Sequence, residues 1–214
     1  MGDEQTTTEA LLADAAMGND AAWGALLTAH QARLTQIIAF RMDSRLRGRV
    51  DAADILQESF AEAALHRDAY FRCPDMPLFI WLRGIVRNKL LEIHRYHLGT
   101  RMRDAKRERS LHLPSESDDA SVALYEYLTA GLTGPSVAVV RSEINARLAE
   151  TLKAMNPADC ELLAMRHYEQ LTNMEVALVL GVPERTAAKR YLRALERLKN
   201  ILAELPGGLS ELRT

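Results

Sequence analysis

The chain has little cysteine and few aromatic residues. Its 214 residues include two cysteines, and phenylalanine, tryptophan and tyrosine together make up 6% of the sequence. Cys73 and Cys160 lie far apart without CxxC spacing, which argues against a disulfide framework or a cysteine-rich zinc site. The scarcity of aromatic and β-branched residues disfavours an all-β fold.

Long apolar runs and a basic N-terminus are also missing. The longest apolar stretches, such as Pro77–Leu82 and Val176–Leu180, fall far short of the roughly 20 residues that a membrane-spanning helix needs. Residues 1–30 contain five acidic residues and no Lys or Arg, which is the reverse of a secretory signal. We therefore expect a cytoplasmic protein that does not associate with a membrane.

Charges of opposite sign are separated along the chain, although the formal net charge is only −2. Lys and Arg outnumber Asp and Glu by nine to three over residues 78–113 and by six to two over residues 184–200. Residues 114–150 between them have two basic and six acidic residues. Because salt screens charges beyond roughly 8 Å, local patches matter more than the sum. Two basic patches predict two contacts with a polyanion, although two solvated helix faces would give the same pattern.

The spacing of apolar residues predicts an all-α fold of two small helical domains joined by a flexible linker. It indicates helices over residues 9–42, with a break at 18–20, and over residues 51–66 and 78–98. Residues 67–77 contain Cys73-Pro74 and Met76-Pro77, and we expect no regular helix there. The composition of residues 99–142 is typical of a linker. We therefore place the domains at residues 1–98 and 143–214.

The second domain contains a predicted helix-turn-helix. Asn156 is a suitable N-cap for a helix that begins at the following proline. Thr172 and Glu175 have the spacing of a capping box at the start of a short helix. Gly181 can end that helix in a left-handed conformation, and Pro183 can open a last helix that extends to about residue 205.

The last helix has one cationic face. At 100° per residue, polar and basic side chains share an arc of about 100°. They are Thr186, Lys189, Arg190, Arg193 and Arg197. We expect the other side, which includes Ala187, Leu192 and Leu198, to pack inward. Such a helix can enter the major groove of DNA, where Arg bonds to guanine edges or phosphates. A surface helix with solvated Lys and Arg is the alternative.

The helix over residues 78–98 carries a second candidate surface for nucleic acid. Its half opposite the apolar stripe holds Arg83, Arg87, Asn88, His94 and Arg95. Tyr70, Phe71 and Arg72 precede it, and aromatic residues beside Arg can take up unstacked bases. We expect Trp81 to be a core residue instead. His94 and His97 have a spacing that metals use, but no third ligand is evident, so we expect no metal site.

The helix over residues 51–66 has an acidic face. We expect Leu56, Phe60 and Ala63 to face inward. Asp54, Gln57, Glu58, Ala61 and Leu65 share the opposite face. Acidic residues beside exposed apolar ones favour a protein partner with basic residues. Helix capping also explains Asp51 and Asp54, so this pattern leaves both explanations open.

Taken in order, these segments resemble a bacterial RNA polymerase sigma factor of the extracytoplasmic-function (ECF) type. The similar segments are DAADILQESF at residues 51–60, PLFIWLRGIVRNKLLEIHRYH at residues 77–97, and the stretch from MNPADC to LERL at residues 155–198. The resemblance implies a region 2-like helical bundle followed by a region 4-like helix-turn-helix. It implies a transcription factor that is not an enzyme and needs no cofactor.

The resemblance also implies partners and residue roles. Asp54, Gln57 and Glu58 match the helix that docks on the clamp helices of the largest subunit of core RNA polymerase, while the second-largest subunit offers its flap. Asn88 matches a residue near a flipped base of the −10 promoter element. Lys189, Arg190 and Arg193 match contacts to the −35 element of promoter DNA. An anti-sigma protein is a further candidate partner.

Two departures from the family pattern and two other functions stay open. Ala187 and Ala188 stand where the family often has Val and a basic residue, and Cys73–Pro77 is an atypical base-reading loop. A stand-alone helix-turn-helix regulator would bind duplex DNA without polymerase. A helical metal-dependent hydrolase would use acidic residues such as Asp51 and Glu58, but no hydrolase motif accompanies them.

Overall fold

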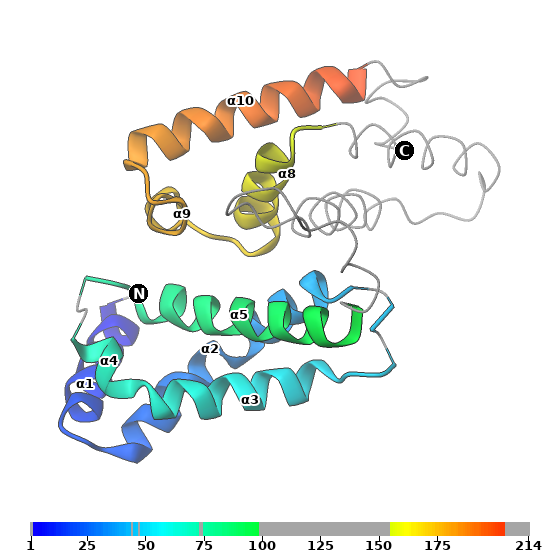
Figure 1. Cartoon of the computed structure of the whole chain (residues 1–214). Helices are drawn as coiled ribbons and strands as arrows, with labels where there is room; N and C mark the ends of the chain where they lie inside the picture. Colours follow the sequence, from blue (N-terminus) through cyan, green and yellow to red (C-terminus); the bar gives the residue numbers. More distant parts are fainter. Residues whose placement is uncertain (1, 44, 47, 73–74, 99–154, 204–214) are drawn as a thin grey trace, which may run out of the picture. The chain divides into compact units, whose positions relative to one another are not determined.

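The computed structural model describes residues 2–43, 45–46, 48–72, 75–98 and 155–203, and the helices in these ranges confirm the all-α prediction (Figure 1). The chain divides into two compact units, residues 1–107 and 108–214, which are described separately. The predicted linker lies outside the described residues, so the domain boundaries stay predictions.

Unit 1 is a bundle of helices around α2. It comprises α1 (Gly2–Ala16), α2 (Asp20–Arg41), α3 (Ala52–Leu65), α4 (Arg67–Phe71) and α5 (Leu78–Leu98). Helix α2 packs against α1, α3 and α5, and α3 also packs against α5. The break between α1 and α2 occurs where predicted, at Gly18 with a φ of +93°. The Asn19 side chain then caps α2 by accepting hydrogen bonds from the N–H groups of Ala21 and Ala22.

The core of unit 1 is apolar and well buried. Its largest fully buried side chains are Leu26, Leu34, Ile37, Ile38, Leu46, Ile55, Leu56 and Leu82. They come from α2, α3, α5 and the connection between α2 and α3, so each amphipathic helix buries its apolar stripe against the others. The predicted inward placement of Leu56 and Ala63 is confirmed, and Phe60 is half-buried.

An aromatic cluster joins the start of α5 to α4 and α2. The ring of Trp23 lies 5.8 Å from Phe71 and 6.1 Å from both Tyr70 and Trp81, between ring centroids. Trp81 is half-buried in this cluster. The prediction that no regular helix occurs between residues 67 and 77 is wrong for α4. Proline restricts the residue immediately before it, and α4 ends at Phe71, two residues before Cys73.

Unit 2 consists of α8 (Pro157–Leu163), a π-helical turn η2 (Ala164–Tyr168), α9 (Asn173–Leu180) and α10 (Glu184–Ala203). Helix α10 packs against both α8 and α9. The core of unit 2 includes Cys160, Leu162, Leu163, Met165, Leu171, Val176, Ala187, Ala194 and Leu198. The predicted N-cap is confirmed, since the Asn156 side chain accepts from the N–H of Ala158 at 2.9 Å.

Among the helices that the structure describes, none combines the length and the apolar character needed to cross a membrane. Cys73 lies outside the described residues, whereas Cys160 is buried and forms no disulfide. Burial, with the charge of Asp159, raises the pKa of Cys160 to about 11. That thiol is therefore protonated and unreactive at neutral pH.

Candidate functional site

The turn between α9 and α10 is held from both sides, as a helix-turn-helix requires. Thr172 and Glu175 form the predicted capping box, with Thr172 Oγ1 accepting from the N–H of Glu175 at 3.1 Å and the Thr172 N–H donating to Glu175 Oε2 at 2.7 Å. Gly181 ends α9 in the left-handed region at φ +61°. The Pro183 carbonyl then accepts from the N–H of Thr186 at 2.8 Å. These local bonds fix where α10 begins.

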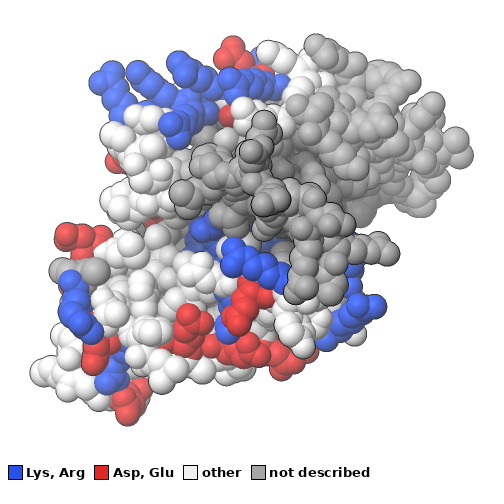
Figure 2. Space-filling view, in the orientation of Figure 1, with Lys and Arg blue, Asp and Glu red and all other residues white. Residues whose placement is uncertain are grey.

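Helix α10 presents exposed cations opposite its buried face. Ala187 and Ala194 are buried, while Lys189, Arg190 and Arg193 are exposed. Figure 2 shows Lys and Arg side chains gathered over α10 in the upper part of the view. The predicted division of α10 into a packing face and a cationic face is confirmed for these residues, and Thr186 is half-buried at its edge.

Two residues of α10 differ from the expectation. Leu192 is 64% exposed, so the prediction that it packs inward is wrong. Arg197 shares the cationic arc but is ion-paired with Asp159 of α8. Arg190, Arg193 and Arg197 together line a pocket of about 200 Å³, whose remaining wall is formed by Ala158, Asp159, Leu162 and Leu180.

Besides the ion pair with α8, α10 also contacts η2 through Tyr191. The hydroxyl of Tyr191 lies 3.1 Å from Nε2 of His167, and the Arg166 guanidinium lies 5.2 Å from the centroid of the Tyr191 ring. Burial, followed by the charge of Arg166, lowers the pKa of His167. The imidazole is therefore neutral at physiological pH and bonds to Tyr191 as an uncharged ring. Helical periodicity gives no signal for this pairing of Tyr191 with His167, which are 24 residues apart in the sequence.

Helix α3 presents its acidic face as predicted. Asp54, Gln57 and Glu58 are exposed, and Leu65 beside them is 83% exposed. The Asp51 side chain accepts from the N–H of Ala53 at 2.9 Å, so helix capping accounts for that residue. Figure 2 shows Asp and Glu side chains gathered over α3 in the lower part of the view.

A lysine of α5 lies among the carboxylates of this face. Nζ of Lys89 is 3.0 Å from Glu92, 3.6 Å from Glu58 and 3.9 Å from Glu62, measured to the carboxylate oxygens. The hydrogen bond with Glu92 and the nearby negative charges raise the pKa of Lys89. Sequence reasoning did not find this cluster, because nothing in the pattern of either helix indicates which residues of α5 face α3.

The predicted nucleic-acid surface of α5 is only partly exposed. Asn88 and Arg95 are exposed and Arg87 is half-buried. Arg72, just after α4, is also exposed, and its Nε donates to the carbonyl of Asp68 at 3.1 Å. Arg83 is only 5% exposed, so its expected place on the open half of the helix is wrong. Helix α5 packs against both α2 and α3, which widens its buried arc to include Arg83.

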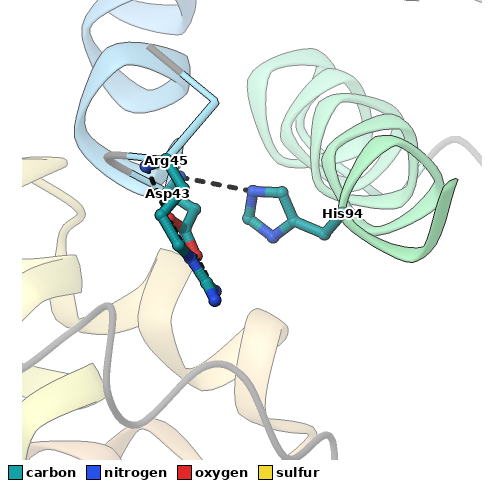
Figure 3. Close-up of polar contacts among 3 residues, drawn as sticks. All are labelled: Asp43, Arg45 and His94. Carbon is teal, nitrogen blue, oxygen red and sulfur yellow. Dashed lines mark hydrogen bonds and ion pairs between the residues drawn. The ribbon is translucent and has the colours of Figure 1, made fainter. Parts of the chain in front are cut away.

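His94 has a structural contact instead of a place on the open half. Its Nε2 accepts a hydrogen bond from the backbone N–H of Asp43 at 3.4 Å, and the Asp43 carboxylate pairs with Arg45 (Figure 3). Burial is the main cause that lowers the pKa of His94, so the ring is neutral at physiological pH. Among the described residues, no group of three His, Cys, Asp or Glu side chains could hold a metal ion.

Comparison with known proteins finds similarity to sigma factors. Residues 145–198 match the family model of sigma-70, region 4, and this range includes α8, α9 and most of α10. The RNA polymerase sigma factor CnrH of Cupriavidus metallidurans is 28% identical over 193 residues, or 90% of this chain and 92% of CnrH.

The fold is similar to that of a solved sigma factor. The structure of CnrH in complex with the cytosolic domain of CnrY matches with a TM-score of 0.52 over 92% of this chain and 97% of that chain, at 22% identity. At this identity the match supports the helical fold alone. The region 4 match and the similarity to CnrH over nine-tenths of the chain both agree with the resemblance to RNA polymerase sigma factors of the ECF type.

Proposed function

We propose that this chain is a sigma factor, which directs core RNA polymerase to its promoters by reading the −35 element with α10 and the melted −10 element with the surface of α4 and α5. The observation that carries the proposal is the helix-turn-helix itself. A capped α9 and a left-handed turn at Gly181 place the exposed side chains of Lys189, Arg190 and Arg193 on one face of α10. A helix with such a face can enter the major groove.

Polymerase docking is assigned to α3. Asp54, Gln57 and Glu58 are exposed together on one face, where Leu65 adds an apolar contact. A basic surface on the clamp helices of the largest subunit would complement this face in charge. The flap of the second-largest subunit is the expected partner of unit 2.

Capture of the melted strand is assigned to Arg72, Arg87, Asn88 and Arg95. The guanidinium groups of the exposed Arg72 and Arg95 and of the half-buried Arg87 can follow a phosphate backbone, and the Asn88 amide can bond to the edge of an extruded base. Arg83 is left out of this group because it is buried. Extrusion costs a few kcal/mol and costs least where the duplex is already opening, so the polymerase has to supply part of the melting.

An anti-sigma protein is proposed as a regulator. The support is that the sigma factor CnrH forms a complex with the cytosolic domain of CnrY. A protein that covered α10 or the acidic face of α3 would block promoter reading or polymerase docking in this chain.

Reconstitution with core polymerase tests the proposal. The purified full chain is mixed with core enzyme and a library of promoter fragments, and run-off transcripts are sequenced. We expect the promoter fragments that are transcribed to share two elements upstream of the transcription start.

Glu58→Lys should greatly reduce transcription and core binding while helix content stays unchanged, because it reverses a charge on the docking face. Glu9→Lys makes the same charge change at an exposed position of α1 and serves as the control. Tight duplex binding without core enzyme, and no transcription with it, would instead favour a stand-alone regulator.

A further inference from the structure

The cationic arc of α10 contains one arginine that is neutralised within the protein. At 100° per residue, Arg190, Arg193 and Arg197 lie within about 60° of one another on the helix surface. All three line the same pocket between α8, α9 and α10. Arg197 is ion-paired with the carboxylate of Asp159 on α8, which is 38 residues away in the sequence.

The two ends of this ion pair differ in burial. The side chain of Asp159 is 12% exposed, whereas that of Arg197 is 56% exposed. If Arg197 turned towards a DNA phosphate, it would leave a largely buried carboxylate without its counter-ion. Removing one partner from a buried pair is far more costly than separating an exposed pair. The geometry therefore favours retention of the pair when α10 approaches DNA.

We propose that Asp159 acts as an internal substitute for a DNA phosphate, which holds Arg197 against α8 and limits the phosphate contacts of α10. In this assignment Arg197 is a positioning residue that joins α8 to α10, and duplex contacts come from Lys189, Arg190 and Arg193. Fewer phosphate contacts lower the non-specific affinity of the free chain, so that base contacts decide where it binds. The inference rests on the proposed role of α10 in reading duplex DNA.

The salt dependence of duplex binding tests the inference. Each phosphate that a protein neutralises adds about 0.9 to the slope of log K against log salt concentration. Asp159→Asn releases Arg197, so this slope should steepen by about 0.9, which is an extra loss of about threefold in affinity over a fourfold rise in salt. At low salt, Asp159→Asn should gain the same factor in affinity for promoter duplexes and for unrelated duplexes. The double variant Asp159→Asn with Arg197→Ala should return to the wild-type slope.

Matched variants separate this effect from net charge and from folding. Glu161→Gln removes the same charge from the opposite side of α8, about 200° around the helix from Asp159. It should leave the slope unchanged. Asp159→Ser is a second variant that releases Arg197, because its shorter side chain has no charge. Circular dichroism confirms that each variant keeps its helix content before binding is measured with the full chain.

Three outcomes would count against the inference. An unchanged slope in both folded Asp159 variants, while the wild type binds duplex, would overturn it and leave the proposed function standing. A decrease of about 0.9 in the slope for Arg197→Ala alone would also overturn it, because Arg197 would then already contact phosphate. If neither the wild type nor any variant bound duplex in the presence of core polymerase, the proposed reading of the −35 element would be wrong, and the inference would be lost with it.

Discussion

Nζ of Lys89 on α5 lies 3.6 Å from Oε2 of Glu58 on α3. Glu58 belongs to the face that we assign to polymerase docking. The same carboxylate therefore lies near Lys89 of this chain and, in the proposal, also meets a basic residue of polymerase. Glu92 and Glu62 lie within 3.9 Å of the same ammonium group, which leaves the cluster with excess negative charge. A basic partner surface can approach these carboxylates without displacing Lys89.

Replacing this lysine should change docking more than stability. The glutamates around Lys89 are partly or largely exposed, so Lys89→Gln should lower the free energy of unfolding by only about 0.2–1 kcal/mol. Affinity for core polymerase should rise at low salt, because the face becomes more negative. Fluorescence competition for core enzyme measures this effect, and Lys199→Gln on α10 is a charge-matched control. Weaker core binding by Lys89→Gln would show that the lysine itself contributes to the interface.

Arg193→Ala should weaken recognition of the upstream promoter element. Arg193 is exposed on the cationic face, and a bidentate contact to guanine contributes about 1–3 kcal/mol of discrimination. Run-off transcription in competition between a promoter and a point-mutated −35 element measures the preference. We expect Arg193→Ala to lose preference at one position of the element. An equal loss on all sequences would assign Arg193 to a phosphate contact instead.

The stability of unit 1 should fall in mildly acidic solution because of His94. Burial lowers the pKa of this ring in the folded state below the ordinary value of 6.5. As the pH falls below 6.5, the unfolded chain therefore binds a proton before the folded chain does, and the free energy of unfolding decreases until the pH reaches the folded pKa. Protonation also removes the lone pair that accepts from the N–H of Asp43.

Urea unfolding between about pH 7.5 and 5.5 checks this dependence. Trp23 and Trp81 are the two tryptophans of the chain, and both lie in unit 1, so their fluorescence reports on the unit that contains His94. His94→Gln keeps a possible acceptor but cannot titrate, and its stability should vary less over this range. The same variation in the wild type and the variant would exclude His94 as a cause. Asp43, whose pKa is lowered chiefly by its bond with Arg45, contributes in a separate window below pH 3.8.

The sequence predicted the features that depend on local rules. The N-caps at Asp51 and Asn156, the capping box at Thr172 and the break at Gly18 were all expected, because each depends on residues within one turn of the helix. The exposed acidic face of α3 followed from a single stripe of apolar residues, since one face of that helix packs inward.

The errors arose where contacts come from distant parts of the chain. Arg83 is buried because α5 packs against two helices at once, and the width of a buried arc cannot be read from the periodicity of one helix. Arg197 has the right place on α10, but its partner Asp159 lies 38 residues earlier. The contact between His94 and Asp43 joins residues 51 positions apart. None of these three relationships leaves a signal in a single sequence without its relatives.

Gly181→Ala should destabilise the helix-turn-helix through backbone strain alone. Gly181 has a φ of +61°, and a Cβ placed there would have no heavy atom within 4 Å. A methyl group therefore fits in the space, but the backbone of an alanine is strained at this φ. An L-residue in this left-handed region costs roughly 1–2 kcal/mol, and Asn costs less because it tolerates the region better. We therefore expect a lower thermal midpoint by circular dichroism for Gly181→Ala, a smaller decrease for Gly181→Asn, and no change in the salt dependence of duplex binding by the folded protein. Gly24→Ala, in the second turn of α2 and also without a heavy atom within 4 Å of the added Cβ, should by contrast be neutral or stabilising. If Gly181→Ala were as stable as the wild type, the turn would have an alternative to the left-handed conformation, and α10 would not be held at one angle to α9.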